Sequence, residues 1–124
     1  MKAFLTVALL MVSAAPLVSS AAEHAKLPKG FSVEIKPGKA HEECVELKKD
    51  ADIAYRFKAS QPVPFNIHYH TGKGKEAKVE YGVKLDAIDA KEDVFRTSID
   101  QHYCWMWTNK TTQSVTLSGE ITAK

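Results

Sequence analysis

The chain has 124 residues, of which 44% are hydrophobic, and 17 Lys and Arg against 15 Asp and Glu give a formal net charge of +2. Basic and acidic residues are interspersed along the chain, which excludes the clustered basic face of a nucleic-acid-binding protein. About 100 residues remain after an expected leader, enough for one domain with one core.

The first 22 residues have the pattern of a secretory signal peptide. Lys2 supplies a positive start, residues 3–12 are almost uninterruptedly apolar, and small residues follow at 19–22. This apolar run is shorter than the roughly 20 residues that span a bilayer. We therefore predict a signal peptide over residues 1–22, a periplasmic or secreted mature protein without a membrane span, and a flexible N-terminal segment at residues 23–30.

Residues 31–124 have the pattern of a β-protein. Apolar and polar residues alternate in short segments, and turn signals recur every 8–12 residues without a clear helical pattern. Pro62 and Pro64 are expected to break the ladder between two strands. We predict one all-β domain, an antiparallel two-sheet β-sandwich of about eight strands. The segments are residues 31–35, 41–49, 53–58, 65–70, 79–85, 95–99, 103–109 and 115–122.

The chain contains two cysteines, Cys44 and Cys104. In an exported protein such a pair favours one intramolecular disulfide. Closing a loop of roughly 60 residues would stabilise the fold by about 4 kcal/mol in the chain-entropy model. A free reactive pair or a metal site formed by the two thiols is the alternative.

Residues 65–70 place two imidazoles on one face of a predicted strand, because His68 and His70 are two positions apart. Such side chains lie about 6.5–7 Å apart, close enough to share an ion when another strand supplies a third ligand. The thioether of Met106 would favour Cu(I), and imidazole also suits Cu(II) and zinc. The metal hypothesis therefore takes His68, His70 and Met106 as ligands, with copper as the first choice and zinc as the second. Otherwise both histidines are solvated and Met106 fills the core, and His41 and His102 are weaker ligand candidates.

Residues 103–109 form the most aromatic run of the chain. If Cys104 points inward to bridge two sheets, Tyr103, Trp105 and Trp107 become an exposed surface for a protein, peptide or glycan. If the disulfide joins neighbouring strands, these rings lie in the core and Met106 lies beside the histidines. An indole could also cover a bound ion through a cation–π contact. The sequence leaves both arrangements open.

The order of these features resembles the GOLD domain, a β-sandwich binding module of early secretory-pathway cargo receptors. The resemblance rests on Glu43-Cys44, Pro64-Phe65-Asn66-Ile67, Tyr103-Cys104 and Trp107-Thr108-Asn109. It implies a β-sandwich that binds without catalysis, with a disulfide between the two cysteines. No coiled coil or transmembrane segment follows in this chain, so a cargo-sorting role is not expected.

Catalytic motifs are missing from the sequence. It contains neither a Gly-x-Ser-x-Gly nor a His-Glu-x-x-His pattern, and its acids alternate with lysines as on a solvated surface. We expect a monomeric, non-catalytic binding protein whose partner is a metal ion or an envelope protein or peptide; a structural subunit of an envelope assembly is a third possibility. Asn109-Lys110-Thr111 is a glycosylation sequon in a eukaryotic host and otherwise a turn.

Overall fold

The computed structural model describes residues 26–124, which form an all-β fold, so the expected signal peptide lies outside the described residues. Within this range the strands are antiparallel, and no helix is long and apolar enough to cross a membrane. One short 3-10 turn, η1, spans Gly74–Glu76. The six strands are β1 (Lys29–Ile35), β2 (Ala40–Leu47), β3 (Asp52–Thr71), β4 (Lys78–Arg96), β5 (Gln101–Thr108) and β6 (Val115–Ala123).

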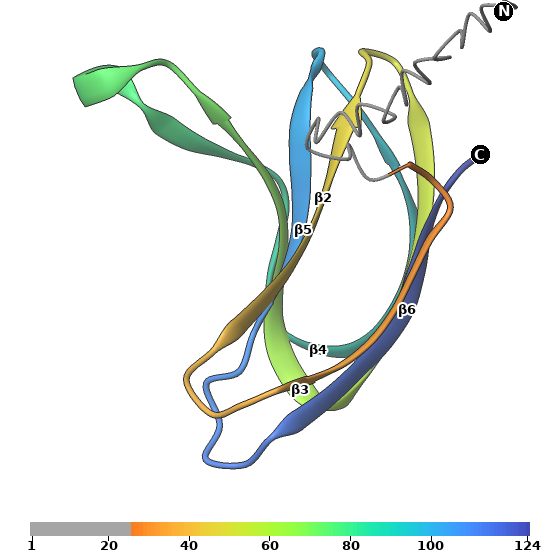
Figure 1. Cartoon of the computed structure of the whole chain (residues 1–124), viewed down its shortest axis with the longest axis vertical. Helices are drawn as coiled ribbons and strands as arrows, with labels where there is room; N and C mark the ends of the chain where they lie inside the picture. Colours follow the sequence, from red (N-terminus) through yellow and green to blue (C-terminus); the bar gives the residue numbers. More distant parts are fainter. Residues whose placement is uncertain (1–25) are drawn as a thin grey trace, which may run out of the picture.

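The strands belong to one sheet in the order β1-β6-β3-β5-β2, with β4 on the other edge of β3. β3 pairs first with β6, over residues 53–59, and then with β5, over residues 65–68. Between these two stretches its register with β4 shifts. The sheet curls there into a half-barrel, and the tip of the β3–β4 hairpin projects away from it (Figure 1).

The all-β antiparallel class is confirmed, but the described residues form six strands in one curled sheet instead of about eight in two sheets. The prolines expected to separate two strands bend β3 without ending it. Residues 86–93, which fall between two of the expected strand segments, lie within β4. The first strand also begins at Lys29, two residues before the expected domain boundary.

The inner face of the curled sheet is the hydrophobic core. Trp105 and Trp107 lie there with Tyr103, and these side chains are 0%, 1% and 0% exposed, respectively. Their outward neighbours Cys104 and Met106 are partly exposed. The second of the two arrangements left open by the sequence is therefore the observed one. The core consists of Ile35, Val45, Leu47, Ile53, Tyr55, Phe57, Val63, Phe65, Ile67, Tyr103, Trp105, Trp107, Val115, Leu117 and Ile121.

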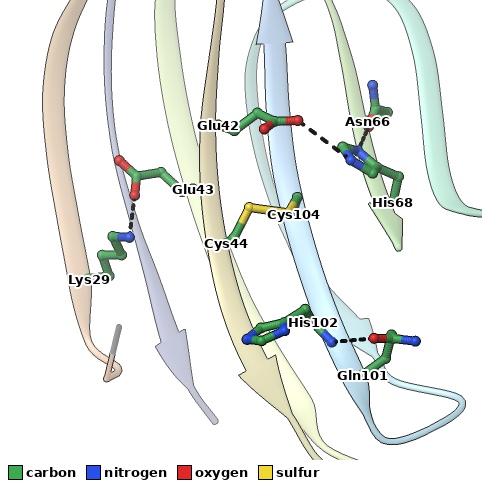
Figure 2. Close-up of a disulfide and its surroundings, with 9 residues drawn as sticks. All are labelled: Lys29, Glu42, Glu43, Cys44, Asn66, His68, Gln101, His102 and Cys104. Carbon is green, nitrogen blue, oxygen red and sulfur yellow. Dashed lines mark hydrogen bonds and ion pairs between the residues drawn. A yellow bond between two sulfur atoms is a disulfide. The ribbon is translucent and has the colours of Figure 1, made fainter. Parts of the chain in front are cut away.

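An ion pair bridges β1 and β2, the two end strands of the strand order. Lys29 Nζ lies 2.6 Å from Glu43 Oε2, and His41 Nε2 donates to Glu43 Oε1 at 2.8 Å. Figure 2 shows Lys29 reaching the carboxylate of Glu43. Because Glu43 is only 7% exposed, its charge needs these partners to remain in the protein interior.

Replacing Lys29 by methionine is expected to lower the free energy of unfolding by about 2 kcal/mol, since the substitution leaves the buried carboxylate of Glu43 without its cation. Urea unfolding followed by tryptophan fluorescence measures this change. Lys48→Met is the matched control, because Lys48 is 83% exposed and lies 3.7 Å from Asp100. Equal losses in the two variants would contradict a specific role of the bridge between the sheet edges.

Asn109 joins the turns at one end of the half-barrel. Its Nδ2 donates to the carbonyl oxygens of Ile35 at 2.8 Å and Gln113 at 2.7 Å. Its Oδ1 accepts from the backbone N–H of Thr111 at 2.9 Å and from its hydroxyl at 2.7 Å. The residue is 0% exposed. The amide that a sequon would present for glycosylation is thus fully engaged inside the fold.

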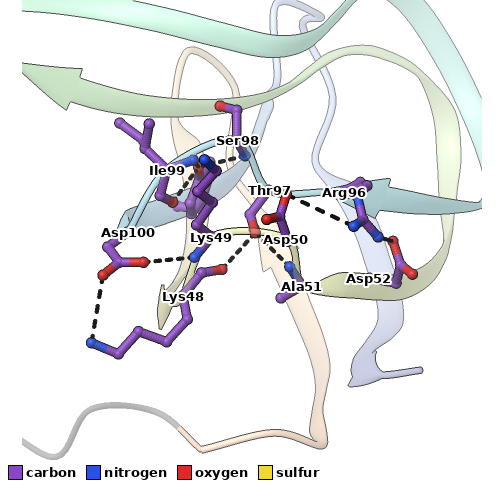
Figure 3. A network of polar contacts seen from close by, with 11 residues as sticks. Lys48, Lys49, Asp50, Ala51, Asp52, Arg96, Thr97, Ser98, Ile99 and Asp100 are labelled. Carbon is purple, nitrogen blue, oxygen red and sulfur yellow. Dashed lines mark hydrogen bonds and ion pairs between the residues drawn. The ribbon is translucent and has the colours of Figure 1, made fainter.

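Thr97 has a similar role at the opposite end, between the β2–β3 and β4–β5 turns (Figure 3). Its hydroxyl donates to the carbonyl of Lys48 at 2.6 Å and accepts from the backbone N–H of Ala51 at 2.9 Å. Arg96 adds an ion pair to Asp52 at 3.1 Å. Both ends of the half-barrel are therefore fixed by side chains that satisfy backbone groups of a distant turn.

Candidate functional site

The outer face of β2, β5 and β3 carries both cysteines, Met106 and His68. Cys44 lies opposite Cys104, which in turn lies opposite His68. One row along, Glu42 lies opposite Met106, which lies opposite Asn66. Paired residues of antiparallel strands point to the same side of the sheet. Each such set of directly paired residues across β2, β5 and β3 is called a row. The two rows therefore bring these side chains onto one face.

The predicted disulfide between Cys44 and Cys104 is confirmed. It joins directly opposed residues of neighbouring strands, with Cα atoms 4.1 Å apart. Because it lies on the outer face, it leaves the inner face to the aromatic rings. Figure 2 shows it between the side chains of Glu42 and His102.

His68 is held in a defined orientation at the centre of this face. It is 5% exposed, and its Nδ1 lies 2.7 Å from Asn66 Oδ1. An amide oxygen only accepts, so Nδ1 carries the proton and Nε2 carries the lone pair in the neutral ring. Nε2 lies 3.5 Å from Glu42 Oε1 (Figure 2). Two acceptors face each other across this gap, and either a proton or a metal cation would satisfy both.

Burial lowers the pKa of His68 from its ordinary value of 6.5; the charge of Glu42 opposes this effect, and His70 adds to it. The neutral form therefore dominates in the folded protein at pH 7. Neutral imidazole is also the form that ligates metals.

The stability of the fold is expected to fall as the pH drops below 6.5. The unfolded chain then binds a proton at His68 more readily than the folded chain, because the folded pKa is lowered. The contribution of neutral His68 to the stability of the fold is fully present above pH 6.5. It is lost as the pH falls from 6.5 through the pKa that His68 has in the folded protein. Urea midpoints measured from pH 7.5 to 5.5 should decline less steeply for His68→Gln than for the unmodified protein. Parallel slopes would contradict this, and His102→Gln on the same face is the control.

His70 lies next to His68 on the exposed part of this face. Their ring centroids are 5.3 Å apart, with planes at 85°. An ion about 2.1 Å from a ring nitrogen lies about 3.2 Å from that ring's centroid, so rings that share an ion have centroids at most about 6.4 Å apart. The observed separation falls within this limit. Tyr81 packs beside His68 at 6.3 Å.

The predicted ligands are thus only partly brought together. Among residues 26–124, no group of three or more His, Cys, Asp or Glu side chains is arranged to hold a metal ion. Met106 lies on the correct face, one row from His68. Glu42 approaches His68 but was missed from the sequence. The sequence did contain an indication of its position. Glu42 precedes Cys44 by two residues, so the two side chains lie on the same face of a strand, which is the outer face when Cys44 is paired with Cys104.

Tyr103, Trp105 and Trp107 do not form an exposed ligand surface in this fold, because all three lie in the core. For the same reason neither indole can cover an ion on the outer face. Phe65 and Phe31 pack against Trp107 at 5.3 and 5.0 Å, and Phe95 contacts Trp105 edge-on at 6.1 Å. The rings that made this run conspicuous in the sequence therefore stabilise the core.

Two open clefts lie away from this face, over β4, β3 and β6. The larger has a volume of about 760 Å³ and is lined by residues that include Phe31, Arg56, Lys58 and Glu120. The smaller, of about 520 Å³, includes Ala54 and Val94. Neither is lined by His68 or its neighbours.

No family model and no curated protein matches the sequence. Among solved structures, a de novo designed double-stranded β-helix has 12% identity over 75% of this chain and 97% of its own, with a TM-score of 0.43. A CBM4 structure has 11% identity over 77% and 84%, with a TM-score of 0.46. A family GH115 4-O-methyl-α-glucuronidase has 11% identity over 97% of this chain and 19% of its own, with a TM-score of 0.40. At this level of likeness they say nothing about ligand or activity.

Proposed function

We propose that the protein is an exported, periplasmic or secreted, non-catalytic binding protein that holds a metal ion on the outer face of β2, β5 and β3. Copper is the first candidate and zinc the second. The observation that carries the proposal is His68, whose Nδ1 is bound by Asn66 at 2.7 Å while its Nε2 faces the Glu42 carboxylate at 3.5 Å.

The spacing of these two groups suits a shared ion. Ligand atoms about 2.1 Å from a tetrahedral ion lie about 3.4 Å apart. The bond from Asn66 also has the form expected of a ligating histidine, which commonly donates its other N–H to a fixed acceptor. Imidazole and carboxylate suit Cu(II) and zinc, and the thioether of Met106 would extend the set toward Cu(I). His70, whose ring centroid lies 5.3 Å from that of His68, is the further ligand of this proposal.

Binding without catalysis is part of the same proposal. Both cysteines are joined in the disulfide, so neither is available as a thiolate nucleophile. The resemblance to a GOLD domain, a module that binds without reacting, points the same way. We infer a monomer.

The alternative function is an interaction module for an envelope protein, peptide or glycan. What favours it is the projecting β3–β4 hairpin, where Val79 and Tyr81 are 44% and 49% exposed. Lys84 lies 4.7 Å above the ring of Tyr81. This surface replaces the three buried aromatics on which the alternative was first based.

Titration of the folded, disulfide-bonded protein with Cu(II), Cu(I) and Zn(II), against a chromophoric chelator, tests the metal proposal. One ion per chain is expected, with affinity reduced at least tenfold by His68→Ala and by Glu42→Gln. Asn66→Ala should cost about tenfold, through the orientation of His68.

His102→Ala is the matched control, because it removes an imidazole from the same face one row away from His68, and its affinity should stay within twofold. All samples carry His24→Ala, because a histidine near the amino terminus can itself bind copper. Affinity unchanged by His68→Ala would overturn the metal proposal and leave the hairpin surface as the better candidate.

A further inference from the structure

The disulfide and His68 occupy one row of the sheet, and the function proposed above does not use the two sulfur atoms. Cys44, Cys104 and His68 are successive residues across β2, β5 and β3, on the same face. We propose that reduction of this disulfide converts the row into a second metal site, with two thiolates and one imidazole as ligands. Its ion would be thiophilic, either Cu(I) or Zn(II). This inference deepens the proposed function, since both sites use His68.

The sheet keeps the two sulfur atoms together once the bond between them is opened. β2 and β5 pair in register along the whole of β2, so the pairing of Cys44 with Cys104 is one of several that hold these strands together. Their Cα atoms are 4.1 Å apart. Two thiolates bound to one tetrahedral ion lie about 3.8 Å apart. Opposed cysteines on adjacent strands can therefore reach one ion without movement of the backbone.

The third ligand of the proposed site is His68, the next residue of the row after Cys104. Nδ1 of His68 is occupied by Asn66, so its other nitrogen is the one available to an ion. Glu42 lies 3.5 Å from that nitrogen, and Met106 lies in the same row as Glu42. A carboxylate or a thioether could take the fourth position, which suits zinc or Cu(I), respectively.

The chemical step requires a dithiol reductant. The reductant gives two electrons and two protons to the disulfide, its own two sulfurs become joined, and Cys44 and Cys104 become thiols. Binding of the ion then displaces the two thiol protons to solvent. Both cysteines are partly exposed on the outer face, which allows access of the reductant. Accessible disulfides are the ones that undergo such exchange.

The test compares the full chain in its oxidised form with the same chain reduced by dithiothreitol and freed of reductant without air. Each form is titrated with Co(II) as a spectroscopic probe and with Zn(II) and Cu(I) in chelator competition. We expect thiolate-to-cobalt charge-transfer absorption in the reduced form only, and at least a 100-fold gain in Zn(II) affinity on reduction. The double variant Cys44→Ser/Cys104→Ser should show neither the charge-transfer absorption nor the gain in Zn(II) affinity. His68→Ala should retain the charge-transfer absorption and lose at least tenfold in affinity. His102→Ala should retain both the absorption and the affinity.

The outcomes separate this inference from the proposed function. Binding by the oxidised form alone, with no gain on reduction, overturns the inference and leaves the proposed function standing. Thiolate-dependent metal binding by the reduced form, with no binding by the oxidised form, supports the inference and overturns the proposed function. Near-UV circular dichroism of the buried tryptophans checks that the reduced sheet is intact; loss of that signal, or metal-linked dimers in sedimentation, would overturn the inference.

Discussion

Replacing Asn109 by aspartate is expected to lower the free energy of unfolding by about 3 kcal/mol, although the two side chains have nearly the same shape. Nδ2 donates to the carbonyl oxygens of Ile35 and Gln113, and the substitution replaces this donor by a charged acceptor. Two carbonyl groups lose their partner, and a carboxylate is buried against them. Urea unfolding monitored by tryptophan fluorescence measures the loss, with an unchanged m-value if the unfolded state is unaffected.

Gln61→Glu is the matched control for that amide-to-acid change. Gln61 is only partly buried and its side chain donates to Gln113 Oε1 at 3.3 Å in an exposed hydrogen bond, so the same chemical replacement should cost less than about 0.5 kcal/mol. A loss at Asn109 no larger than that at Gln61 would show that the turns at this end do not depend on the amide.

Gly119→Ala is expected to destabilise the fold by about 2–3 kcal/mol, a large effect for a single methyl group. A Cβ at this position would overlap the backbone carbonyl oxygen of Arg56 and lie 2.6 Å from Cζ of Phe31. The ring of Phe31 covers Gly119 and packs on Trp107 with centroids 5.0 Å apart. To relieve both overlaps, β6 must separate from β3 at Arg56 and the ring of Phe31 must shift on Trp107. Chemical denaturation measures the cost, and near-UV circular dichroism reports the displaced tryptophan.

Gly30→Ala provides the comparison, because the nearest atom to its added Cβ would be the carbonyl oxygen of Gly119 at 3.9 Å, an ordinary contact. Both glycines lie within strands, so the difference between the two variants isolates the close approach at Gly119 from the general effect of glycine in a strand. Similar stabilities for the two variants would show that the close packing of the Phe31 ring on Gly119 does not limit the side chain at this position.

The strand pattern was predictable because alternation with a period of two directly reports which face of a strand is buried. Residues 53–57 and 65–67 follow it. The bend in β3 was not predictable, because proline in a strand ordinarily signals an interruption. Here Pro62 and Pro64 lie where β3 passes from β6 to β5 and where its register with β4 shifts, and neither proline is paired with a residue of β4, β5 or β6. A missing N–H group is tolerated at such irregular positions.

The strand conformation of residues 86–93 was not predictable for a different reason. Their charged and alanine-rich composition has little strand character of its own, yet they are extended because β3 supplies a ladder on one side, with Ala90 opposite Lys58. Tertiary pairing outweighs the weak local preference at such positions. A single sequence does not contain the identity of that partner strand.

The candidate site was predictable only as far as each strand could be considered alone. Alternation correctly placed His68 and His70 on one face, and the neighbouring-strand option for the disulfide correctly implied that Met106 shares that face. Glu42 could not be found in the same way, since its approach to His68 depends on the register of three strands. The burial of Trp105 depended on the same undetermined register.

The position of β6 between β1 and β3 has a consequence for biosynthesis. A nascent chain that has emerged only as far as residue 110 would present β1 without the strand it pairs with among residues 26–124, since that partner is residues 115–121. The sheet can therefore close only after translation has passed residue 121. Until then any factor that binds the nascent chain would meet a sheet in which β1 has no strand beside it.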